Sequence, residues 1–438
     1  MDYQEALKYI SNSHKFGMKL GLETTEKLME KLGNPQNGLK IIHVAGTNGK
    51  GSVCSFIAKI LEKSGYKVGL FTSPFLEVFN ERIRINGKNI SDEQIAKAIS
   101  EIKVRVEKMI EEGYSSPTEF ELVTAMAFLI YKWEKVDYVV LEVGLGGRYD
   151  STNIIKEPLI SVITSISLDH TKVLGDTIEK ISYEKGGIIK ENSAVVVYSQ
   201  SENAENVLRN IAKEKNTDYI EAKFDSIAII KNDINSQKFN FTIGNKSFKN
   251  MEINLIGEHQ VKNCITAINA IEYLRKSNKI KNITDESIKL GIKETKWPGR
   301  VEKIMENPTF IIDGAHNEDG AKSLKNVIDK NFKNKKLILM IGMLEDKDID
   351  SVLDILVPSF TKIIVTEPNN PRKISANKLK KKIEKYTKHV ESVDNIEDAL
   401  KRTIEISDKD SVIISAGSLY MIGEVRTLMR KISDYDFE

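Results

Sequence analysis

A glycine-rich segment, HVAGTNGKGSV at residues 43–53, carries the side chains with the clearest capacity for chemistry. It follows the apolar run LKIIHVAG (39–46) and precedes apolar residues at helical spacing, which predicts a loop between a buried strand and a helix N-terminus. Glycines let backbone N–H groups approach a phosphate, and the helix dipole adds partial positive charge. Lys50 would add a full charge, and Ser52 would supply an oxygen ligand for magnesium. The segment therefore predicts a site for a nucleotide phosphate.

The spacing differs from the general Walker pattern GxxxxGK[ST]. Only two residues separate Gly46 from Gly49, and a glycine follows Lys50. The alternative interpretation of the segment alone is a glycine-rich turn between a strand and a helix that binds no ligand.

Further polar residues follow predicted strands. Glu142 ends the run DYVVLE, and His170 lies in SLDHT, just after LISVIT (159–164). The carboxyl edge of a parallel sheet is where open α/β folds bind ligands, so both side chains are candidates for one site. A solvated strand-end carboxylate and a hydrogen-bonded structural histidine are the alternatives, and Asp169 is predicted to orient the loop.

The composition of the chain indicates which class of protein positions these groups. The 438 residues carry 65 Lys+Arg against 63 Asp+Glu, a net charge of +2, so no basic field predicts nucleic acid as a partner. The two cysteines, Cys54 and Cys264, are far apart, which predicts buried free thiols instead of a disulfide or a zinc site. The N-terminus lacks a secretory signal, and no apolar run approaches the ~20 residues of a membrane span, so we expect a cytoplasmic protein without membrane contact.

Apolar runs alternate with helical patterns through most of the chain, which predicts an α/β fold with a mostly parallel sheet. A change to short alternating segments predicts a small antiparallel insertion over 217–256, with a hairpin turn at Gly244-Asn245. Pro298 and Gly299 in WPGR predict a boundary between domains at 1–296 and 297–438. Other predicted strands are 66–71, 137–144, TFIIDGA, KKLILMIGM, TKIIVTE and SVIISAGS, and predicted helices are 92–112, 117–134, 176–190, 259–276 and 284–293.

An ordered set of motifs resembles one family. GTNGKGS is accompanied by FGMKLGLE (16–23), TSPFLEVFNERIRING (72–87), TEFELVTAMAF (118–128), LEVGLGGRYDSTN (141–153), SLDHTKVLG (167–175), EKGGIIK (184–190), GEHQVKN (257–263), WPGR (297–300) and DGAHN (313–317). In this order they resemble the folylpolyglutamate synthase/dihydrofolate synthase branch of the Mur ligases. The resemblance implies a P-loop-type N-terminal ATPase domain and a Rossmann-like C-terminal domain. It also implies a monomer that uses ATP and Mg²⁺ to add L-glutamate to tetrahydrofolate or dihydropteroate through an acyl phosphate.

The resemblance also implies roles for individual residues. Lys50, Lys185 and His316 would be catalytic, and Lys185 would carry a carbamate formed from CO2. The metal ligands would be Ser73, Glu142, His170 and Lys185. The nucleotide would contact Gly46, Thr47, Asn48, Gly49, Lys50, Gly51, Ser52, Asn263, Arg300 and Asp313, with Asn263 on the adenine side.

Two positions depart from the family pattern. Phe75 stands where the family segment usually has histidine, and Cys264 stands where alanine is common. The alternatives to a folate enzyme are another Mur-type amino-acid ligase, a P-loop kinase or NTPase, and a nucleotide-regulated binding module without turnover. Whether the chain also acts as a dihydrofolate synthase is open at this stage.

Overall fold

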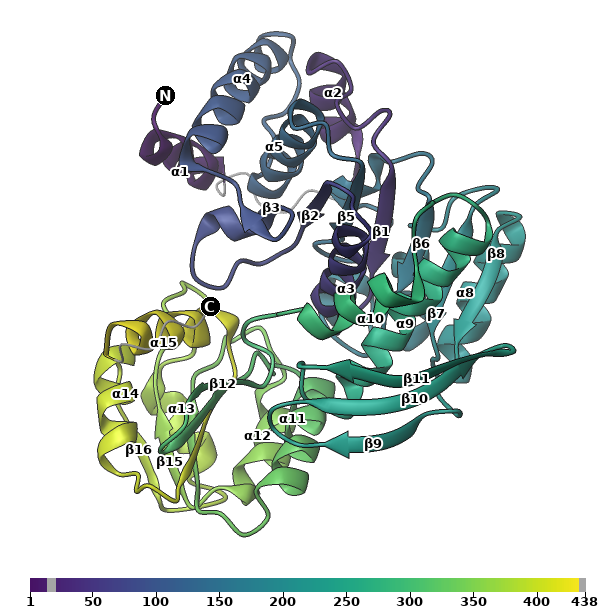
Figure 1. The fold of residues 1–438 in the computed structure, drawn as a ribbon. Helices are drawn as coiled ribbons and strands as arrows, with labels where there is room; N and C mark the ends of the chain where they lie inside the picture. Colours follow the sequence, from purple (N-terminus) through teal and green to yellow (C-terminus); the bar gives the residue numbers. More distant parts are fainter. Residues whose placement is uncertain (14–20, 433–438) are drawn as a thin grey trace.

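Three sheets organise the molecule in the computed structural model, which describes residues 1–13 and 21–432 (Figure 1). The motif at 16–23 therefore lies outside the described residues except for its last three positions. The termini belong to different parts of the molecule, the first helices to the large N-terminal layer and the last helix to the C-terminal sheet (Figure 1).

The largest sheet has eight strands in the order β4-β3-β2-β5-β1-β6-β7-β8. The six strands from β2 to β8 in that order run parallel, and β3 and β4 add an antiparallel edge. The bounds are β1 Ile41–Ala45, β2 Val68–Phe71, β3 Ile83–Ile85, β4 Lys88–Asn89, β5 Tyr138–Glu142, β6 Ile160–Ile163, β7 Ala194–Tyr198 and β8 Asp218–Ala222. The prediction of a mostly parallel sheet is confirmed.

Helices cover both faces of this sheet, and the alternation of side chains along a strand decides which face each apolar residue serves. In β1, Ile42 and Val44 pack into the core under α3 (Lys50–Lys63), α9 (Glu258–Lys276) and α10 (Asp285–Glu294). Ile41 packs on the opposite side. The helices there are α1 Tyr3–Asn12, α2 Glu23–Lys31, α4 Asp92–Glu111 and α5 Glu119–Trp133, with α7 Ile178–Gly186 and α8 Glu202–Glu214 beyond them.

Two predicted bounds are wrong. Asp218–Ala222 belongs to the parallel sheet as its edge strand β8, so the antiparallel insertion contains only β9 (Ala228–Asn232), β10 (Gln237–Ile243) and β11 (Lys246–Ile253). An edge strand is only partly covered, which is why its polar alternation looked like a surface hairpin. The predicted helix 176–190 ends at Gly186, where a second glycine follows. The predicted hairpin turn is confirmed by the pairing of Ile243 with Lys246.

The C-terminal part is a second α/β layer with strand order β12-β13-β17-β14-β15-β16. Its strands are β12 Glu302–Met305, β13 Thr309–Ile312, β14 Leu337–Ile341, β15 Lys362–Val365, β16 Val390–Ser392 and β17 Val412–Ala416, and only β12 runs antiparallel to its neighbour. One face packs on α11 (Glu318–Asn331), α12 (Ile349–Leu356) and α13 (Ala376–Ile383). The other packs on α14 (Ile396–Glu405) and α15 (Leu419–Ile432).

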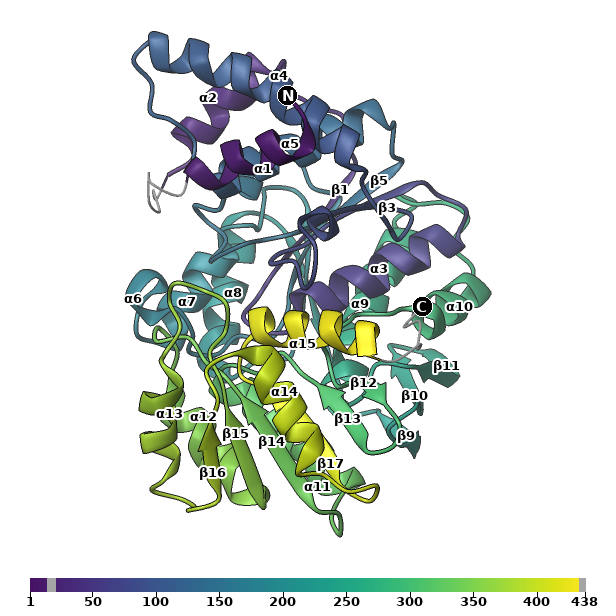
Figure 2. The ribbon, with the colours of Figure 1, turned by 90° about the vertical axis from the view of Figure 1, so that its left-hand side faces the viewer.

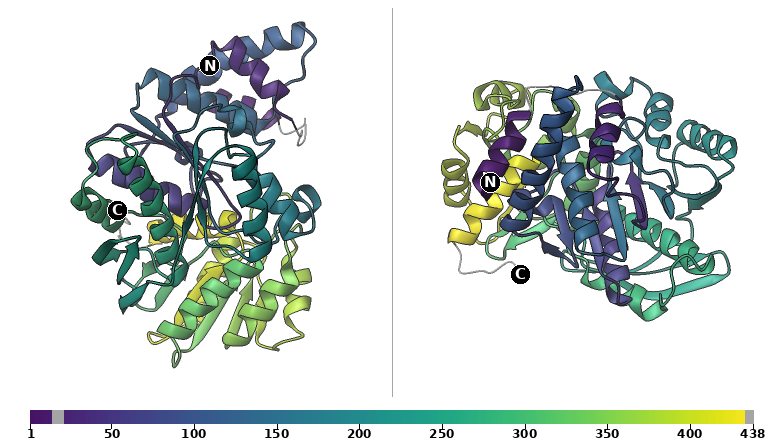
Figure 3. Two further views of the ribbon diagram at one scale, coloured as in Figure 1. Left: turned by 90° about the vertical axis from the view of Figure 1, so that its right-hand side faces the viewer. Right: turned by 90° about the horizontal axis from the view of Figure 1, so that it is seen from above.

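The helix α15 lies along the boundary between the C-terminal sheet and the N-terminal layer (Figure 2). The rotated views show the same stacking, with the C-terminal sheet below the large sheet (Figure 3, left). Three short elements, η2 (Phe79–Arg82), η3 (Ser151–Ile154) and α6 (Thr171–Leu174), contribute residues to a cavity that residues of the C-terminal part also line. Functional groups from both parts can therefore meet there.

Cys54 and Cys264 are both buried free thiols, as predicted. Across the residues that the structure describes, no helix is long and apolar enough to cross a membrane.

Candidate active site

One cavity of about 400 Å³ between the two parts gathers every predicted site residue. These residues come from loops that follow β1, β2, β6 and β13, from the end of β5, from the helices α3, α7 and α9, and from the segment before β12. They are Gly46, Thr47, Asn48, Gly49, Lys50, Gly51, Ser52, Ser73, Glu142, His170, Lys185, Asn263, Arg300, Asp313 and His316.

The glycine loop leaves β1 and enters α3, as the sequence predicts. Gly46 and Gly49 have φ values of 150° and 85°, which L side chains rarely adopt. A Cβ on Gly46 would lie 1.8 Å from the Thr164 hydroxyl oxygen, so this turn also requires the absence of a side chain. Lys50 Nζ donates to the carbonyl oxygens of Gly46 (3.0 Å) and Thr47 (3.1 Å), which keeps its charge at the loop.

Glu142 lies at the end of β5 with only 4% of its surface exposed. Its Oε2 accepts a hydrogen bond from the Ser73 backbone N–H at 3.0 Å, which places the Ser73 loop beside the carboxylate. Burial raises the pKa of Glu142 to about 7, while Lys50 opposes that rise. A buried carboxylate of this kind is stabilised in its charged form by a cation.

Lys185 lies on α7 and is 3% exposed. Its Nζ donates to the Gly46 carbonyl at 2.8 Å. Burial, followed by the charge of Lys50, lowers the pKa of Lys185 to about 7. The amine is therefore partly neutral near pH 7, which is the form that reacts with electrophiles.

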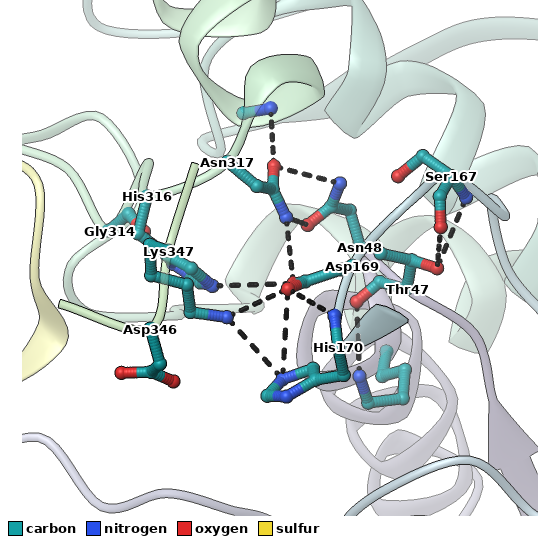
Figure 4. A network of polar contacts seen from close by, with 12 residues as sticks. Thr47, Asn48, Ser167, Asp169, His170, Gly314, His316, Asn317, Asp346 and Lys347 are labelled. Carbon is teal, nitrogen blue, oxygen red and sulfur yellow. Dashed lines mark hydrogen bonds and ion pairs between the residues drawn. The ribbon is translucent and has the colours of Figure 1, made fainter. Parts of the chain in front are cut away.

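Asp169 is the centre of a polar network that joins the two parts of the molecule (Figure 4). It accepts from Lys347 Nζ at 2.9 Å and from Asn317 Nδ2 at 3.2 Å, and it also accepts the backbone N–H of His170 at 2.8 Å. Burial alone would raise the pKa of Asp169, but Lys347 holds it well below its usual range. The predicted role of Asp169 in orienting its loop is confirmed.

The same network reaches the glycine loop. Asn317 Nδ2 donates to Asn48 Oδ1 at 3.1 Å, and Asn317 Oδ1 accepts the N–H of Gly320, which caps α11. His316 hydrogen-bonds through Nδ1 to the Gly314 carbonyl at 2.7 Å, so Nδ1 carries the proton and Nε2 is unprotonated. Burial lowers the pKa of His316 to about 4, and burial and Lys347 do the same for His170.

The remaining predicted residues, Asp313, Arg300 and Asn263, line the rest of this cavity. Asp313 accepts the N–H groups of Val301 (2.9 Å) and Ala315 (2.8 Å), which fixes the chain as it enters the second sheet. Arg300 lies against Gly314, where a Cβ would approach its Nη1 to 2.0 Å. Asn263 lies against Gly49 in the same way, at 2.5 Å from the position of a Cβ.

A second cavity of about 560 Å³ adjoins the first. The two share a wall made by Ser73, Pro74, residues 144–146, His170, Leu174, His316 and Leu419. Phe120 forms part of the second cavity and lies against Gly144, where a Cβ would meet its ring at 2.4 Å. Arg82, Lys347 and Arg372 bring positive charge to this cavity.

The donor atoms around Glu142 suit magnesium, although no three His, Cys, Asp or Glu side chains converge on a metal position within the described residues. Mg²⁺ prefers hard oxygens and keeps several waters, with one or two carboxylates and the substrate phosphates completing its shell. Glu142, whose buried carboxylate lines the cavity beside Ser73, fits such a site. The residues present therefore fit the ion that the sequence implies.

Sequence reasoning missed several residues of the two cavities. Arg82 and Phe120 lie inside the motifs at 72–87 and 118–128, so these motifs are the feature of the sequence from which both residues could have been identified. Lys347 follows β14 at the carboxyl edge of the second sheet, the position where α/β folds bind ligands, but no local pattern distinguishes it from other lysines.

Comparisons with known proteins agree with this geometry. The Mur ligase middle domain matches residues 44–271, and the Mur ligase glutamate ligase domain matches residues 299–419. The dihydrofolate synthase/folylpolyglutamate synthase of Bacillus subtilis is 38% identical, covering 98% of this chain and 99% of the relative. Mycobacterium tuberculosis folylpolyglutamate synthase, solved with ADP and AMPPCP, superposes with a TM-score of 0.89 at 30% identity, covering 98% of this chain and 99% of that one. An E. coli protein solved with DHPP and ADP gives a TM-score of 0.88 at 28% identity, covering 99% and 98% of the two chains.

Proposed function

Since the chain belongs to the Mur ligase family, in the branch of the folylpolyglutamate and dihydrofolate synthases, we propose that the two adjoining cavities form the active site of an ATP-dependent ligase that joins L-glutamate to a folate. The observation that carries the proposal is the wall that the two cavities share. A nucleotide phosphate held by the glycine loop would meet, at this wall, the carboxylate of a substrate held in the larger cavity.

The chemistry has two steps. The γ-phosphoryl group of ATP passes to the substrate carboxylate, which yields an acyl phosphate and ADP. The amine of glutamate, after losing a proton, attacks the acyl carbon, and inorganic phosphate leaves as the amide forms. The protein supplies position and charge for both steps and needs no covalent nucleophile.

In this proposal the residues of the smaller cavity bind the nucleotide. The N–H groups at residues 46–52 and the start of α3 hold the phosphates, and Lys50 neutralises charge that moves during transfer. His316 is neutral and lies in the shared wall, where its unprotonated Nε2 accepts a hydrogen bond from the incoming amine. Asn263, Arg300 and Asp313 surround the nucleoside side.

Glu142, Ser73 and His170 would hold magnesium, with Lys185 as a carbamate adding oxygen ligands. When bound, the ion neutralises phosphate charge and polarises the transferring group. Ser73 is positioned for this by the bond from its N–H to Glu142.

The larger cavity takes the folate. Its aromatic and aliphatic wall, which includes Phe120, Leu145 and Tyr420, suits the flat rings of tetrahydrofolate or dihydropteroate. Arg82 lies over the rings of Phe75 and Phe79, at 5.2 and 5.5 Å from their centroids. Phe75, the residue that departs from the family pattern, thus supports a buried cation at the edge of this cavity.

We further propose a domain boundary between residues 296 and 297, a monomeric enzyme and a cytoplasmic location. The linker WPGR lies between the last helix of the first part, α10, and the first strand of the second, β12, which supports the boundary. Light scattering coupled to gel filtration tests the monomer: the expected mass is that of one 49.5 kDa chain.

An ADP-release assay tests the proposed function. Tetrahydrofolate, dihydropteroate and glutamate are omitted in turn, and the products are identified by mass. We expect release that requires both glutamate and a folate, and a product heavier by one glutamyl residue. Release that is independent of both would instead indicate an NTPase.

Lys50→Ala should abolish this turnover. Lys59→Ala is the matched control, since Lys59 lies on the same helix but forms an ion pair with Glu62 away from the cavities. A Lys50→Ala enzyme with full activity would contradict the assignment of the glycine loop.

A further inference from the structure

His43 is a buried titratable group that neither step of the proposed reaction uses. It lies in the middle of β1, three residues before Gly46, and has no exposed surface. Its Nε2 is 2.9 Å from the hydroxyl oxygen of Thr152. Burial lowers the pKa of His43 to about 3, so the ring is neutral and carries a single N–H at working pH.

The neighbours of Thr152 determine where that N–H lies. Thr152 Oγ1 is 2.5 Å from Asp150 Oδ1, and Asp150 also accepts the backbone N–H of Thr152 at 3.0 Å. Burial raises the pKa of Asp150, and the hydrogen bonds that it accepts from Thr152 and Leu145 oppose that rise. Both carboxylate oxygens accept a backbone N–H, Oδ1 from Thr152 and Oδ2 from Leu145, so Asp150 acts as an acceptor and the single hydroxyl proton of Thr152 points to it. The hydroxyl oxygen then accepts from His43, which places the proton of the ring on Nε2. Consistently, His43 Nδ1 has no hydrogen-bond partner within the described residues.

Asp150 connects these hydrogen bonds to the wall of the larger cavity. Its Oδ2 accepts the N–H of Leu145 at 2.9 Å, and both residues line that cavity. Leu145 belongs to the stretch 144–146 that the two cavities share. A chain of hydrogen bonds therefore links the strand that carries the glycine loop, through Thr152 and Asp150, to the loop that both cavities share, with Asp150 accepting from both sides.

The segment around Thr152 is fixed by further hydrogen bonds and by burial. Asn153 Nδ2 donates to the carbonyl oxygens of Arg148 (3.0 Å) and Gly187 (3.1 Å). The Ser151 hydroxyl is 2.6 Å from that of Thr124 on α5. All four residues of η3 are buried.

We propose that His43 is a positioning residue for the reaction: through Thr152 it orients Asp150 and thereby holds the loop 144–147 in the shape that binds the folate. The proposal rests on the assignment of the larger cavity to the folate. The proposal assigns to His43, the first residue of the glycine-rich motif, a role that phosphate binding does not explain.

Three variants test the proposal kinetically. Thr152→Val removes the hydroxyl at nearly constant volume, and His43→Asn moves the donor to the Nδ1 position, out of reach of Thr152. His43→Gln restores an N–H near the position of Nε2. We expect the first two to raise the KM for tetrahydrofolate or dihydropteroate about five- to tenfold, as for the loss of one buried hydrogen bond, with the KM for ATP within about twofold. The glutamine variant should return the folate KM to within about twofold of the native enzyme.

A merely structural role predicts other results. An unchanged folate KM in His43→Asn and Thr152→Val, or a parallel rise of the KM values for folate and ATP, would overturn the proposal. So would a glutamine variant no better than the asparagine variant. If the native enzyme shows no folate-dependent ADP release at all, it is the proposed function that fails.

Nitrogen-15 NMR of the histidine rings tests the geometry without turnover. The chain has six histidines, and the signal that disappears in His43→Gln identifies His43. We expect a neutral ring protonated at Nε2, whose N–H signal shifts in Thr152→Val. A ring protonated at Nδ1 would overturn the proposed order of donors even if His43→Asn failed to fold.

Discussion

Burial acts on two side chains of opposite charge at the glycine loop. It raises the pKa of Glu142 and lowers that of Lys185, and both come to about 7. In each case the neutral form is favoured because the cavity wall offers less solvation than water. The site without substrate thus disfavours isolated charge, and ATP with its magnesium would supply the partners that make the charged carboxylate favourable.

Glu142→Gln should remove a pH dependence of stability. Because the native pKa is raised from 4.5 to about 7, the native state binds more protons than the unfolded state between these values, and the free energy of unfolding falls as pH rises through this window. Over the whole window the free energy of unfolding of the native protein falls by about 3 kcal/mol. We expect urea unfolding without magnesium to show the variant gaining stability over the native protein from pH 5 to pH 8.

Magnesium provides the control for this prediction. At pH 8 the ion should raise the Tm of the native protein and leave Glu142→Gln nearly unchanged. An equal increase in both proteins would mean that the ion binds elsewhere.

Lys185 should react with CO2 more readily than an ordinary lysine. With a pKa lowered to about 7, most of its amine is neutral at pH 8, and only the neutral amine attacks CO2 to form a carbamate. We expect a carbamate signal in carbon-13 NMR of the protein in labelled bicarbonate with ADP and magnesium, absent in Lys185→Met. Lys190→Met is the matched control, since burial also lowers the pKa of Lys190, to about 8. A signal lost only in the Lys190 variant would contradict the assignment.

At the scale of elements, the interdomain linker contacts the phosphate loop directly. Trp297 lies against Gly51 in the first turn of α3, where a Cβ would approach its ring to 2.4 Å. The Arg84 guanidinium lies over the Trp297 ring, 5.3 Å from its centroid, and its Nε donates to Asn89 Oδ1 at 3.1 Å. The first turn of α3 is therefore packed against the segment that joins the two parts.

Gly51→Ala should impair nucleotide binding although alanine favours helices. Gly51 has a helical backbone, so propensity alone predicts a gain of about 1 kcal/mol, whereas the clash with Trp297 must displace either the linker or the start of α3. We expect at least a tenfold weaker affinity for ADP by calorimetry. Trp297→Leu should restore part of that affinity in the double variant, and no restoration would show that the clash is not the cause.

Elements with strong patterns were predictable, and contacts between elements were not. The buried runs at β1, β5 and β6 and the periodic helices α4, α5 and α9 follow from the sequence because each stretch is long and apolar on the required faces. The short strands β3, β4 and β16 carry too few residues to show a period. The site residues that follow parallel strands converge on one cavity because the sheet brings those ends together. The contacts of His43, Trp297 and Lys347 depend on packing between distant segments, which no local pattern records.

At the scale of the whole molecule, two of the clusters of polar contacts between the parts lie near the candidate site. One is the Asp169 network with Lys347 and Asn317 (Figure 4). The other joins the loop after Ser73 to α15: Glu77 forms ion pairs with Arg426 and, at 3.3 Å, with Arg430, and it accepts from the Thr427 hydroxyl at 2.9 Å. The first cluster lies at the cavities and the second beside the Ser73 loop, so the segments that line the cavities also make contacts between the two parts.

Glu77→Gln should therefore shift the molecule toward an open arrangement. The side chains of Glu77 and Arg426 are 11% and 5% exposed, so losing the negative charge of Glu77 removes one ionised partner of a buried guanidinium, while the ion pair with Glu302 at 2.9 Å remains. A deficit of roughly 1–3 kcal/mol is typical for a buried charged group that loses a partner. Small-angle X-ray scattering should show a larger radius of gyration for the variant than for the native protein, and kcat should fall about three- to tenfold because assembly of the site is disfavoured. Glu397→Gln is the matched control: it breaks the exposed pair with Lys401 within α14 and should change neither value. A Glu77→Gln enzyme with the native radius and the native kcat would show that this contact does not govern closure.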